Sequence, residues 1–377
     1  MKHHLLILMV LCFVTIPGIA ATDVPADSLY SVSASTEAPS AAKRFSLKET
    51  AKKLDMKFSG YIITQYTYSD QKHQDTNGGF NLRLVRLNLQ GYCFDQFQYR
   101  LQMEVNGEPG SKKGPRIVDA FVEWQKYDFL RLKLGQYKRP FGFENPMHPL
   151  DVGFGSYSQA TTKLIFTDRC GAPASNGRDI GLQAQGDFFP AADGHKWLHY
   201  QIGVFNGQGT NFSDKDKHKD IIGGLWVSPV KNLRIGAFGW DGTYTNSDYS
   251  ATDSVGMKSC KRIRWAVGVD YESDWVVRSE YISSVGGKVT NRYASDRSDA
   301  WYVTVGAPLF KDFKLYGRWD CYRDTKQWES LKQNFGLTAN YNLGKHLVFQ
   351  LNYYFTNERT ARDKYYNNID VQVAARF

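Results

Sequence analysis

Apolar and polar residues alternate along short runs through most of this chain, from about Met56 onward. In one late run, Phe349, Leu351 and Tyr353 share one face, while Gln350 and Asn352 share the other. This period of two is the pattern of a β-strand with one apolar and one polar face. About sixteen such runs begin near Phe58, Leu82, Gln96, Ile117, Phe129, Arg178, Trp197, Ile221, Asn232, Arg262, Asp274, Ala300, Phe313, Leu331, His346 and Asn368.

The lengths of the connections between these runs alternate as well. Connections after even-numbered runs are short, as at Phe94-Asp95 and Glu272-Ser273, and those after odd-numbered runs are longer and polar, as at Gly207 to Lys219. Membrane barrels have short periplasmic turns and long external loops, whereas a β-sandwich has no reason to sort its loops by parity. We therefore expect an all-β fold, a transmembrane antiparallel β-barrel of about 16 strands, with both chain termini of the barrel on the periplasmic side.

The third long connection, Pro140 to Gly177, is the longest of all and is rich in Gly, Pro and aromatic residues. Loops of this length are uncommon in compact domains and are usually functional. A sixteen-stranded barrel leaves a water channel unless something enters it. We expect this long third extracellular loop to be folded into the lumen, where it would form a constriction.

The start of the chain has the features of a secretory signal peptide. A basic start precedes an apolar run from Leu5 to Ile16 that is too short to span a bilayer comfortably, and small residues follow at Ala20-Ala21. The next residues are rich in Ser, Ala and Pro, and a capping box at Ser46 and Glu49 predicts a short helix. The expected organisation is a signal peptide at 1–20, a flexible periplasmic leader at 21–55 and the barrel at 56–377.

The composition is compatible with an exported barrel and favours some classes of binding partner over others. The mean hydropathy is −0.47 and no later apolar stretch could form a transmembrane helix, but barrel strands average out as hydrophilic. The net charge of +9 favours anionic solutes or anionic lipid head groups over nucleic acid. The spacings of the four cysteines left after cleavage match no metal site, and we expect no bridge essential to the fold among Cys93, Cys170, Cys260 and Cys321.

Five tracts occur in an order that resembles a known family. They are RLVRLNLQGY from Arg83 to Tyr92, DAFVEW from Asp119 to Trp124, GQYKRPFGFE from Gly135 to Glu144, the Asp168-Arg169 pair, and GRDIGLQ from Gly177 to Gln183. Together they resemble the phosphate-selective porin O/P family of bacterial outer-membrane porins. The resemblance implies a sixteen-stranded trimeric porin with an inward-folded third loop in a Gram-negative outer membrane. It also suggests phosphate, although the family name does not by itself decide the solute.

Basic residues on the polar faces of the runs are the candidates for anion contact. Arginine meets phosphate or carboxylate oxygens with a planar fork and stays charged at any relevant pH. Arg83 and Arg86 can share a face only if a bulge at Leu84-Val85 resets the alternation. The predicted pore-lining set, which includes two residues of the long loop, is Arg83, Arg86, Arg100, Arg131, Lys133, Lys163, Arg169, Arg264 and Arg318.

Carboxylates on the same faces leave a second interpretation open. Cross-strand ion pairs could make much of the basic ladder structural, so the sign of the lumen charge is not decided by the sequence. The acidic residues concerned are Glu104, Asp119, Glu123, Asp179, Asp187, Asp270, Glu280 and Asp320.

Two pairs of opposite charge flank the end of the long loop, at Asp168-Arg169 and Arg178-Asp179. One interpretation places Arg169 in the pore, and the other makes these residues a latch that pins the loop to the wall. We favour the latch for Asp168, Arg178 and Asp179.

The sequence favours a transport function over a catalytic one. The histidines have no metal-ligand spacing and no serine lies in a nucleophile motif, so we expect no enzyme activity, metal or cofactor. We expect an outer-membrane porin for passive diffusion of small hydrophilic solutes, leaning toward anions, surrounded by outer-membrane lipid and assembled as a homotrimer. The alternatives are a secreted β-rich carbohydrate-binding protein or adhesin, and an outer-membrane barrel enzyme.

Overall fold

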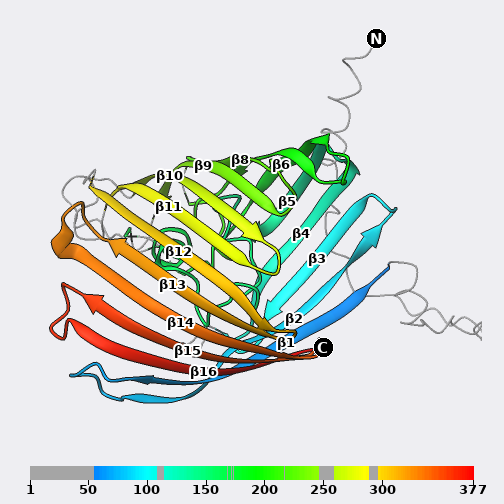
Figure 1. Ribbon diagram of the computed structural model, residues 1–377. Coiled ribbons are helices and arrows are strands. Elements are labelled where there is room, and N and C mark those ends of the chain that lie inside the picture. The colour runs from blue at the N-terminus through cyan, green and yellow to red at the C-terminus, as the bar shows by residue number, and fades with distance from the viewer. Residues whose placement is uncertain are drawn as a thin grey trace, which may run out of the picture. The chain divides into compact units, whose positions relative to one another are not determined.

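A computed structural model describes residues 55–107, 114–167, 169–170, 172, 174–215, 217–245, 259–287 and 296–377. The expected signal peptide and nearly all of the expected leader lie outside these residues. Sixteen antiparallel strands form one closed barrel in which each strand pairs with its neighbours in sequence and β1 pairs with β16 (Figure 1). The predicted all-β barrel of about 16 strands is confirmed.

The strands have the following bounds: β1 Lys57–Ser69, β2 Gly78–Cys93, β3 Phe97–Glu104, β4 Arg116–Tyr127, β5 Leu130–Lys138, β6 Arg178–Pro190, β7 Lys196–Phe205, β8 Asp220–Val227, β9 Leu233–Thr245, β10 Ser259–Glu272, β11 Val276–Gly286, β12 Arg297–Phe310, β13 Phe313–Arg323, β14 Leu331–Leu343, β15 Leu347–Glu358 and β16 Tyr365–Arg376.

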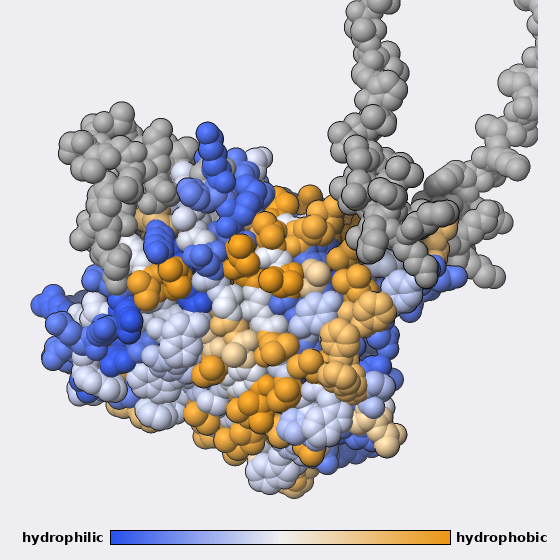
Figure 2. All heavy atoms as spheres, turned by 90° about the horizontal axis from the view of Figure 1, so that it is seen from above, coloured by the Kyte–Doolittle hydropathy of each residue, from blue (hydrophilic) through white to orange (hydrophobic). Residues whose placement is uncertain are grey.

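Side chains alternate between the two faces of the barrel wall as the sequence pattern predicts. On β15, Phe349, Leu351 and Tyr353 are exposed on the outer face, and Gln350 and Asn352 are buried on the inner face. Apolar side chains gather over much of the outer surface in Figure 2, with polar residues collected toward one edge. An apolar exterior around a polar interior is the arrangement of a barrel surrounded by lipid.

The connections also follow the predicted parity. Short turns follow even strands, such as residues 128–129 after β4 and 311–312 after β12, whereas residues 139–177 follow β5 and 206–219 follow β7. The connection after β9 lies outside the described residues. One end of the barrel therefore carries short turns and the other carries long loops.

The last residue of the chain closes the barrel. Phe377 exchanges two backbone hydrogen bonds with Gly60 of β1, with N···O distances of 2.8 and 3.0 Å. A Cβ atom at Gly60 would lie 2.6 Å from the Phe377 ring and 2.8 Å from the Arg86 carbonyl oxygen. Since real Cβ contacts are not this short, the seam requires glycine at this position.

The bulge expected in the second strand is present, one residue from the expected place. Ile63 pairs with Leu84 and the next residue, Thr64, pairs with Leu82, so Arg83 is the extra residue of β2. This bulge lets both Arg83 and Arg86 reach the interior, because it resets the alternation between them.

The described helices are short and few: α3 (Gln159–Thr161) and η1 (Thr162–Phe166), both in the long loop, and η2 (Trp328–Ser330). No helix among the described residues is both long and apolar enough to cross a membrane.

Candidate functional site

The long connection between β5 and β6, residues 139–177, is held by carboxylates on distant strands. Glu280 of β11 accepts hydrogen bonds from the backbone N–H groups of Phe143 at 2.9 Å and Glu144 at 2.7 Å. Asp320 of β13 accepts from the backbone N–H of Gln159 at 2.9 and 3.0 Å. Because a carboxylate that accepts backbone N–H bonds satisfies donors that a loop cannot pair internally, these two residues fix the path of the segment.

Amide side chains on the last three strands add further anchors. Asn340 of β14 donates to the Gly153 carbonyl oxygen at 2.9 Å, and Asn352 of β15 accepts from the Gly155 N–H at 2.8 Å. Arg278 of β11 donates to the Val152 carbonyl oxygen at 2.8 Å. The anchored positions thus extend from β11 to β15, on strands remote in the barrel order from β5 and β6, where the segment begins and ends.

Aromatic side chains of this segment pack directly against glycines in the barrel wall. A Cβ at Gly268 of β10 would lie 3.0 Å from Phe143 Cδ2, and a Cβ at Gly336 of β14 would lie 2.9 Å from Phe154 Cε1. The bare backbone at these two positions allows the rings to approach the sheet closely. Phe143 and Phe154 are 2% and 1% exposed, which makes them apolar anchors.

Hydrogen bonds and ion pairs connect the two ends of the segment to each other and to the wall. Lys138 donates through Nζ to the Asn145 and Met147 carbonyl oxygens at 2.5 and 2.7 Å. Arg139 lies 3.6 Å from Asp179. Arg178 lies 2.6 Å from Asp119 of β4.

Arg178 and Asp179, the two latch residues inside the described chain, therefore take separate partners. Arg178 connects the end of the segment to β4, and Asp179 connects it to the start at Arg139. Their latch role remains a prediction. Asp168, the third latch candidate, lies outside the described residues.

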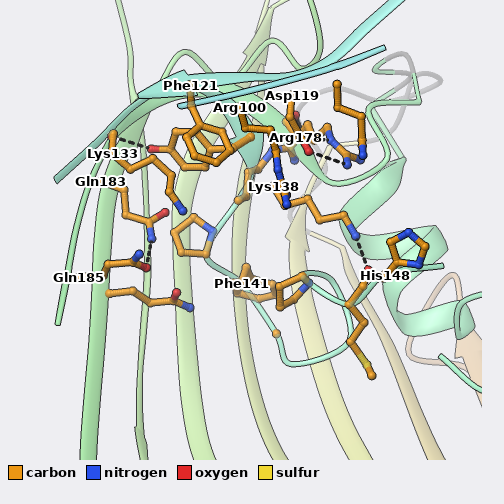
Figure 3. Close-up of a pocket in the computed structure, with 18 of the residues that line it drawn as sticks. Arg100, Asp119, Phe121, Lys133, Lys138, Phe141, His148, Arg178, Gln183 and Gln185 are labelled. Atoms are coloured by element: carbon orange, nitrogen blue, oxygen red, sulfur yellow. Dashed lines mark hydrogen bonds and ion pairs between the residues drawn. The ribbon is translucent and has the colours of Figure 1, made fainter. Parts of the chain in front are cut away.

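Three cavities adjoin this segment and share lining residues. The central cavity, of about 410 Å³, is shown in Figure 3, where Lys133, Lys138 and Arg100 come from the wall and Phe141 and His148 from the segment. Its lining comprises Tyr61, Arg86, Arg100, Gln102, Asp119, Phe121, Lys133, Tyr137, Lys138, Arg139, Pro140, Phe141, Gly142, Pro146, Met147, His148, Pro149, Arg178, Gln183, Gln185 and Gln201.

A second cavity of about 300 Å³, the loop-side cavity, includes Arg83, Arg116 and Glu104 and shares Arg86, Lys138, Pro149 and Arg178 with the central one. A third of about 300 Å³, the turn-side cavity, is nearer the short turns. It shares Gly142, Pro146, Gln185 and Gln201 with the central cavity and adds Glu123, Gln125, Arg131, Phe143, His199, Trp226 and Arg234. The three cavities therefore adjoin one another from the loop end of the barrel toward its turn end.

Basic side chains outnumber acidic ones along these cavities, ten against three among the described residues. Each of the three carboxylates is paired: Glu104 with Arg86 at 2.6 Å, Asp119 with Arg178 at 2.6 Å, and Glu123 with Lys133 at 3.2 Å. Three more of the cations pair with carboxylates outside the lining: Arg131 with Asp187, Arg139 with Asp179 and Arg234 with Asp270. The cations still outnumber all of these carboxylates, so a positive excess remains. The ten basic residues are Arg83, Arg86, Arg100, Arg116, Arg131, Lys133, Lys138, Arg139, Arg178 and Arg234.

The nine predicted pore-lining residues divide into two groups. The five that line the cavities are Arg83, Arg86, Arg100, Arg131 and Lys133. The other four lie outside all three cavities and are Lys163, Arg169, Arg264 and Arg318.

Each residue of the second group has a local environment that explains its place. Lys163 is exposed on η1, and Arg169 lies 3.2 Å from Asp324, at the loop end of β13. The guanidinium of Arg264 lies 4.3 Å from the centre of the Trp240 ring. Arg318 is covered by the long segment and donates to the Ser156 carbonyl oxygen at 3.0 Å. Which inward-facing arginines remain beside open space thus depends on where the segment packs.

Sequence reasoning missed four of the basic lining residues. Arg234 shares a face with Gly236, Phe238 and Trp240 and could have been found by parity. Arg116, Lys138 and Arg139 lie at strand ends next to long loops, where alternation does not indicate a direction.

Comparison with known proteins supports this architecture. Residues 60–239 match the family described as phosphate-selective porin O and P. No curated protein matches the chain.

Several solved structures share the fold. An anion-selective porin from Comamonas acidovorans has a TM-score of 0.62 and 13% identity, covering 85% of this chain and 99% of that one. OmpF of Salmonella typhi, in complex with daunomycin, has a TM-score of 0.62 and 12% identity over 85% and 97% of the two chains. The trimer form of OmpT, an outer membrane protein of Vibrio cholerae, has a TM-score of 0.59 and 13% identity over 85% and 99%.

The closed barrel and the family match both point to a porin, as the order of the sequence tracts also does. The chain thus resembles the phosphate-selective porin O and P family over residues 60–239, and its fold is that of outer-membrane porins.

Proposed function

We propose that this protein is an outer-membrane porin through which small hydrophilic solutes diffuse passively, with a preference for anions. The observation that supports the proposal is the basic lining of three adjoining cavities, in which ten cations face three carboxylates and three further carboxylates pair with the lining from outside it. In a narrow channel an ion loses part of its hydration, and charged side chains act on it through a reduced dielectric. An excess of fixed positive charge then raises the local concentration of anions and lowers that of cations.

The long segment, residues 139–177, has the role of a constriction in this proposal. The support comes from its hydrogen bonds to Glu280, Asp320 and Asn352, which lie on strands far from those where the segment begins and ends. A segment that folds inward and packs on β11 to β15 leaves the path for solutes beside β2 to β9. The basic residues of that wall would then be the ones that a passing ion meets.

Phosphate is one of the anions that this lining suits, since guanidinium groups bind its oxygens in bidentate fashion. The family description names phosphate, and one structural relative is described as anion-selective. The proposal is an anion-leaning channel in general, with phosphate as one permeant solute among several.

The remaining parts of the proposal concern assembly and chemistry. A homotrimer in outer-membrane lipid is consistent with the exposed apolar belt and with the trimer form of one relative. The family and the fold are those of a channel, and we propose that the protein has no catalytic role. Among the described residues, no group of three or more His, Cys, Asp or Glu side chains could hold a metal ion.

Ion selectivity in a planar lipid bilayer tests the proposal. Purified protein in a KCl gradient is expected to give stepwise conductance and a reversal potential of the sign set by chloride. A reversal potential set by potassium would overturn the anion preference, and an absence of conductance would overturn the porin function itself. Replacement of KCl by potassium phosphate in the same cell measures the relative permeability of phosphate.

A further inference from the structure

The turn-side cavity differs from the rest of the lining in having an apolar wall. The ring centres of Trp226 on β8 and Phe143 of the long segment lie 5.7 Å apart in an edge-on arrangement. The imidazole of His199 on β7 stacks on Trp226 with centres 3.8 Å apart and planes 15° apart. A path for hydrated ions alone does not need this wall, because the faces of the Phe143 and Trp226 rings are apolar and do not replace water around an anion.

Two guanidinium groups border this aromatic wall. The Arg234 guanidinium lies 5.1 Å from the centre of the Phe143 ring and 5.9 Å from that of the Trp226 ring. Its Nε and Nη2 donate to one oxygen of Asp270, at 2.9 and 2.5 Å, which leaves the Nη1 edge for another acceptor. The orientation of Arg234 is therefore fixed before any solute arrives, which lowers the entropy cost of binding.

The second guanidinium is fixed in the same way. Arg131 Nη2 donates to Asp187 at 2.6 Å, and the other oxygen of Asp187 lies 2.7 Å from His199 Nδ1. Asp187 thus orients both the cation and the ring that stacks on Trp226. Among the described residues, the only carboxylate in the cavity lining is Glu123, which is occupied by Lys133 at 3.2 Å and by the Gln185 amide at 2.5 Å.

The size and charge of the cavity limit the class of ligand. Its volume of about 300 Å³ is at the lower end of small-molecule sites. Each arginine is already paired with a carboxylate, Arg234 with Asp270 and Arg131 with Asp187. The cavity therefore offers guanidinium donors with little net positive charge, which suits a single carboxylate better than a multiply charged phosphate. The aromatic wall favours a flat apolar group next to that carboxylate.

We infer that the turn-side cavity is a binding site for small carboxylates that carry an aromatic ring, with Arg234 and Arg131 meeting the carboxylate and Trp226, which is held from behind by Phe143, meeting the ring. This inference rests on the proposed channel function and adds a solute class to it. A weak site on the path would raise the occupancy of such solutes, and weak binding still allows them to leave.

Block of the chloride current measures this binding. Benzoate is the probe, acetate is the carboxylate without a ring, and inorganic phosphate is the anion without a carboxylate. Benzoate is expected to halve the chloride current at a concentration about tenfold lower than acetate or phosphate, as a buried charge-assisted contact plus ring packing would give. Since the site lies near the short turns, block is expected to be stronger when benzoate is added on that side.

Substitutions locate the site. Arg234→Gln is expected to weaken benzoate block about tenfold and to weaken acetate block as well, because both anions carry the carboxylate that Arg234 meets. Trp226→Leu keeps every charge and is expected to weaken benzoate block alone. Arg362→Gln, on the exposed connection between β15 and β16, is the matched control and is expected to have no effect.

The outcomes separate this inference from the channel function. Equal block by benzoate and acetate in the unmodified protein would overturn the site while leaving anion preference in KCl intact. If Arg234→Gln fails to insert, Arg234→Lys retains the charge but loses the planar fork, and it is expected to weaken benzoate block to an intermediate degree. Unchanged benzoate block in both Trp226→Leu and Arg234→Lys would also overturn the inference.

Discussion

Arginine side chains on the inner wall of this barrel differ in what surrounds them. Arg86 and Arg178 each form an ion pair at 2.6 Å, and the guanidinium of Arg318 is covered by the long segment. Arg100 instead bonds to the amide oxygen of Gln90, at 2.8 and 3.2 Å, and has no carboxylate partner in the described part of the chain. Its charge is therefore the least compensated of these four, and it is expected to act most strongly on a passing ion.

Replacement of Arg100 by Gln tests this ranking. A unit charge about 7 Å from an ion contributes about 1 kcal/mol at an effective dielectric constant of roughly 40, which is about a fivefold change in an equilibrium. Arg100→Gln is expected to lower the chloride-to-potassium permeability ratio by at least this factor, because the lost charge attracts chloride and repels potassium. Reversal potentials in a KCl gradient measure it, with Arg362→Gln as the control. An unchanged ratio would show that Arg100 does not act on the permeating ion.

His148 of the long segment illustrates how burial changes a titration. Burial lowers the pKa of its imidazole from the usual 6.5 to about 4, and its Nδ1 accepts a hydrogen bond from the Leu150 N–H at 3.3 Å. A protonated Nδ1 could not accept that bond. His148 is thus expected to be neutral at physiological pH and to add no charge to the central cavity.

The same pKa shift predicts a pH dependence of stability. Because the folded-state pKa lies below the unfolded value, the unfolded chain binds the proton first, and stability falls as pH drops from about 6.5 to about 4. The slope from this group is at most about 1.4 kcal/mol per pH unit. Urea unfolding in detergent at several pH values measures it, and His148→Gln is expected to flatten the curve. Equal slopes for the two proteins would contradict the shift.

At the scale of elements, the long segment and the wall fit together through small residues. Gly336 on β14 lies beneath Phe154, whereas a Cβ atom at Gly317, on the neighbouring strand β13, would meet nothing within 4 Å. The two glycines belong to paired strands but have opposite surroundings. The close contact with Phe154 therefore requires glycine at position 336, whereas position 317 has room for a side chain.

Gly336→Ala is expected to displace Phe154, because its new Cβ would lie 2.9 Å from the ring. Overpacking of this kind costs about 1–3 kcal/mol. Single-channel conductance is expected to change in size and to fluctuate more, since the segment would lose an anchor. Gly317→Ala is the matched control and is expected to behave like the unmodified protein. Identical conductance in the two variants would mean that the segment does not depend on this contact.

At the scale of the whole molecule, closure of the barrel depends on one seam. The backbone bonds between Gly60 and Phe377 complete the pairing of β1 with β16, and no edge strand is left open among the sixteen described strands. Closed barrels pair every strand, which a membrane requires because the hydrocarbon offers no water to unpaired backbone groups.

Gly60→Val is expected to hinder closure, since the space for its side chain is filled by the Phe377 ring and by the Arg86 carbonyl group. Folding yield into detergent or lipid measures the effect, with the mobility shift between heated and unheated samples on a gel as the readout. Gly79→Val on β2 is the control, because a Cβ at Gly79 meets nothing within 4 Å. Normal folding of Gly60→Val would show that the seam tolerates a side chain.

The amino-acid sequence alone determined the class of fold, because the alternation of apolar and polar residues is a local signal. The starts of β6, β13 and β14 agree with the expected Arg178, Phe313 and Leu331, and the parity of connection lengths predicted which end carries the loops. Boundaries next to loops were less accurate: β2 begins at Gly78 and was expected near Leu82. Gly78 and Gly79, which begin this strand, have no side chains that could show the alternation.

The choice of lining residues was decided only by the tertiary structure. Alternation shows that Arg100 and Arg318 both face inward, but it contains no information on which of them a segment from β5 and β6 will cover. That depends on contacts between residues far apart in sequence, such as those of Gln159 with Asp320. Local pattern therefore determined the wall, and long-range packing decided which of its inward-facing residues line the cavities.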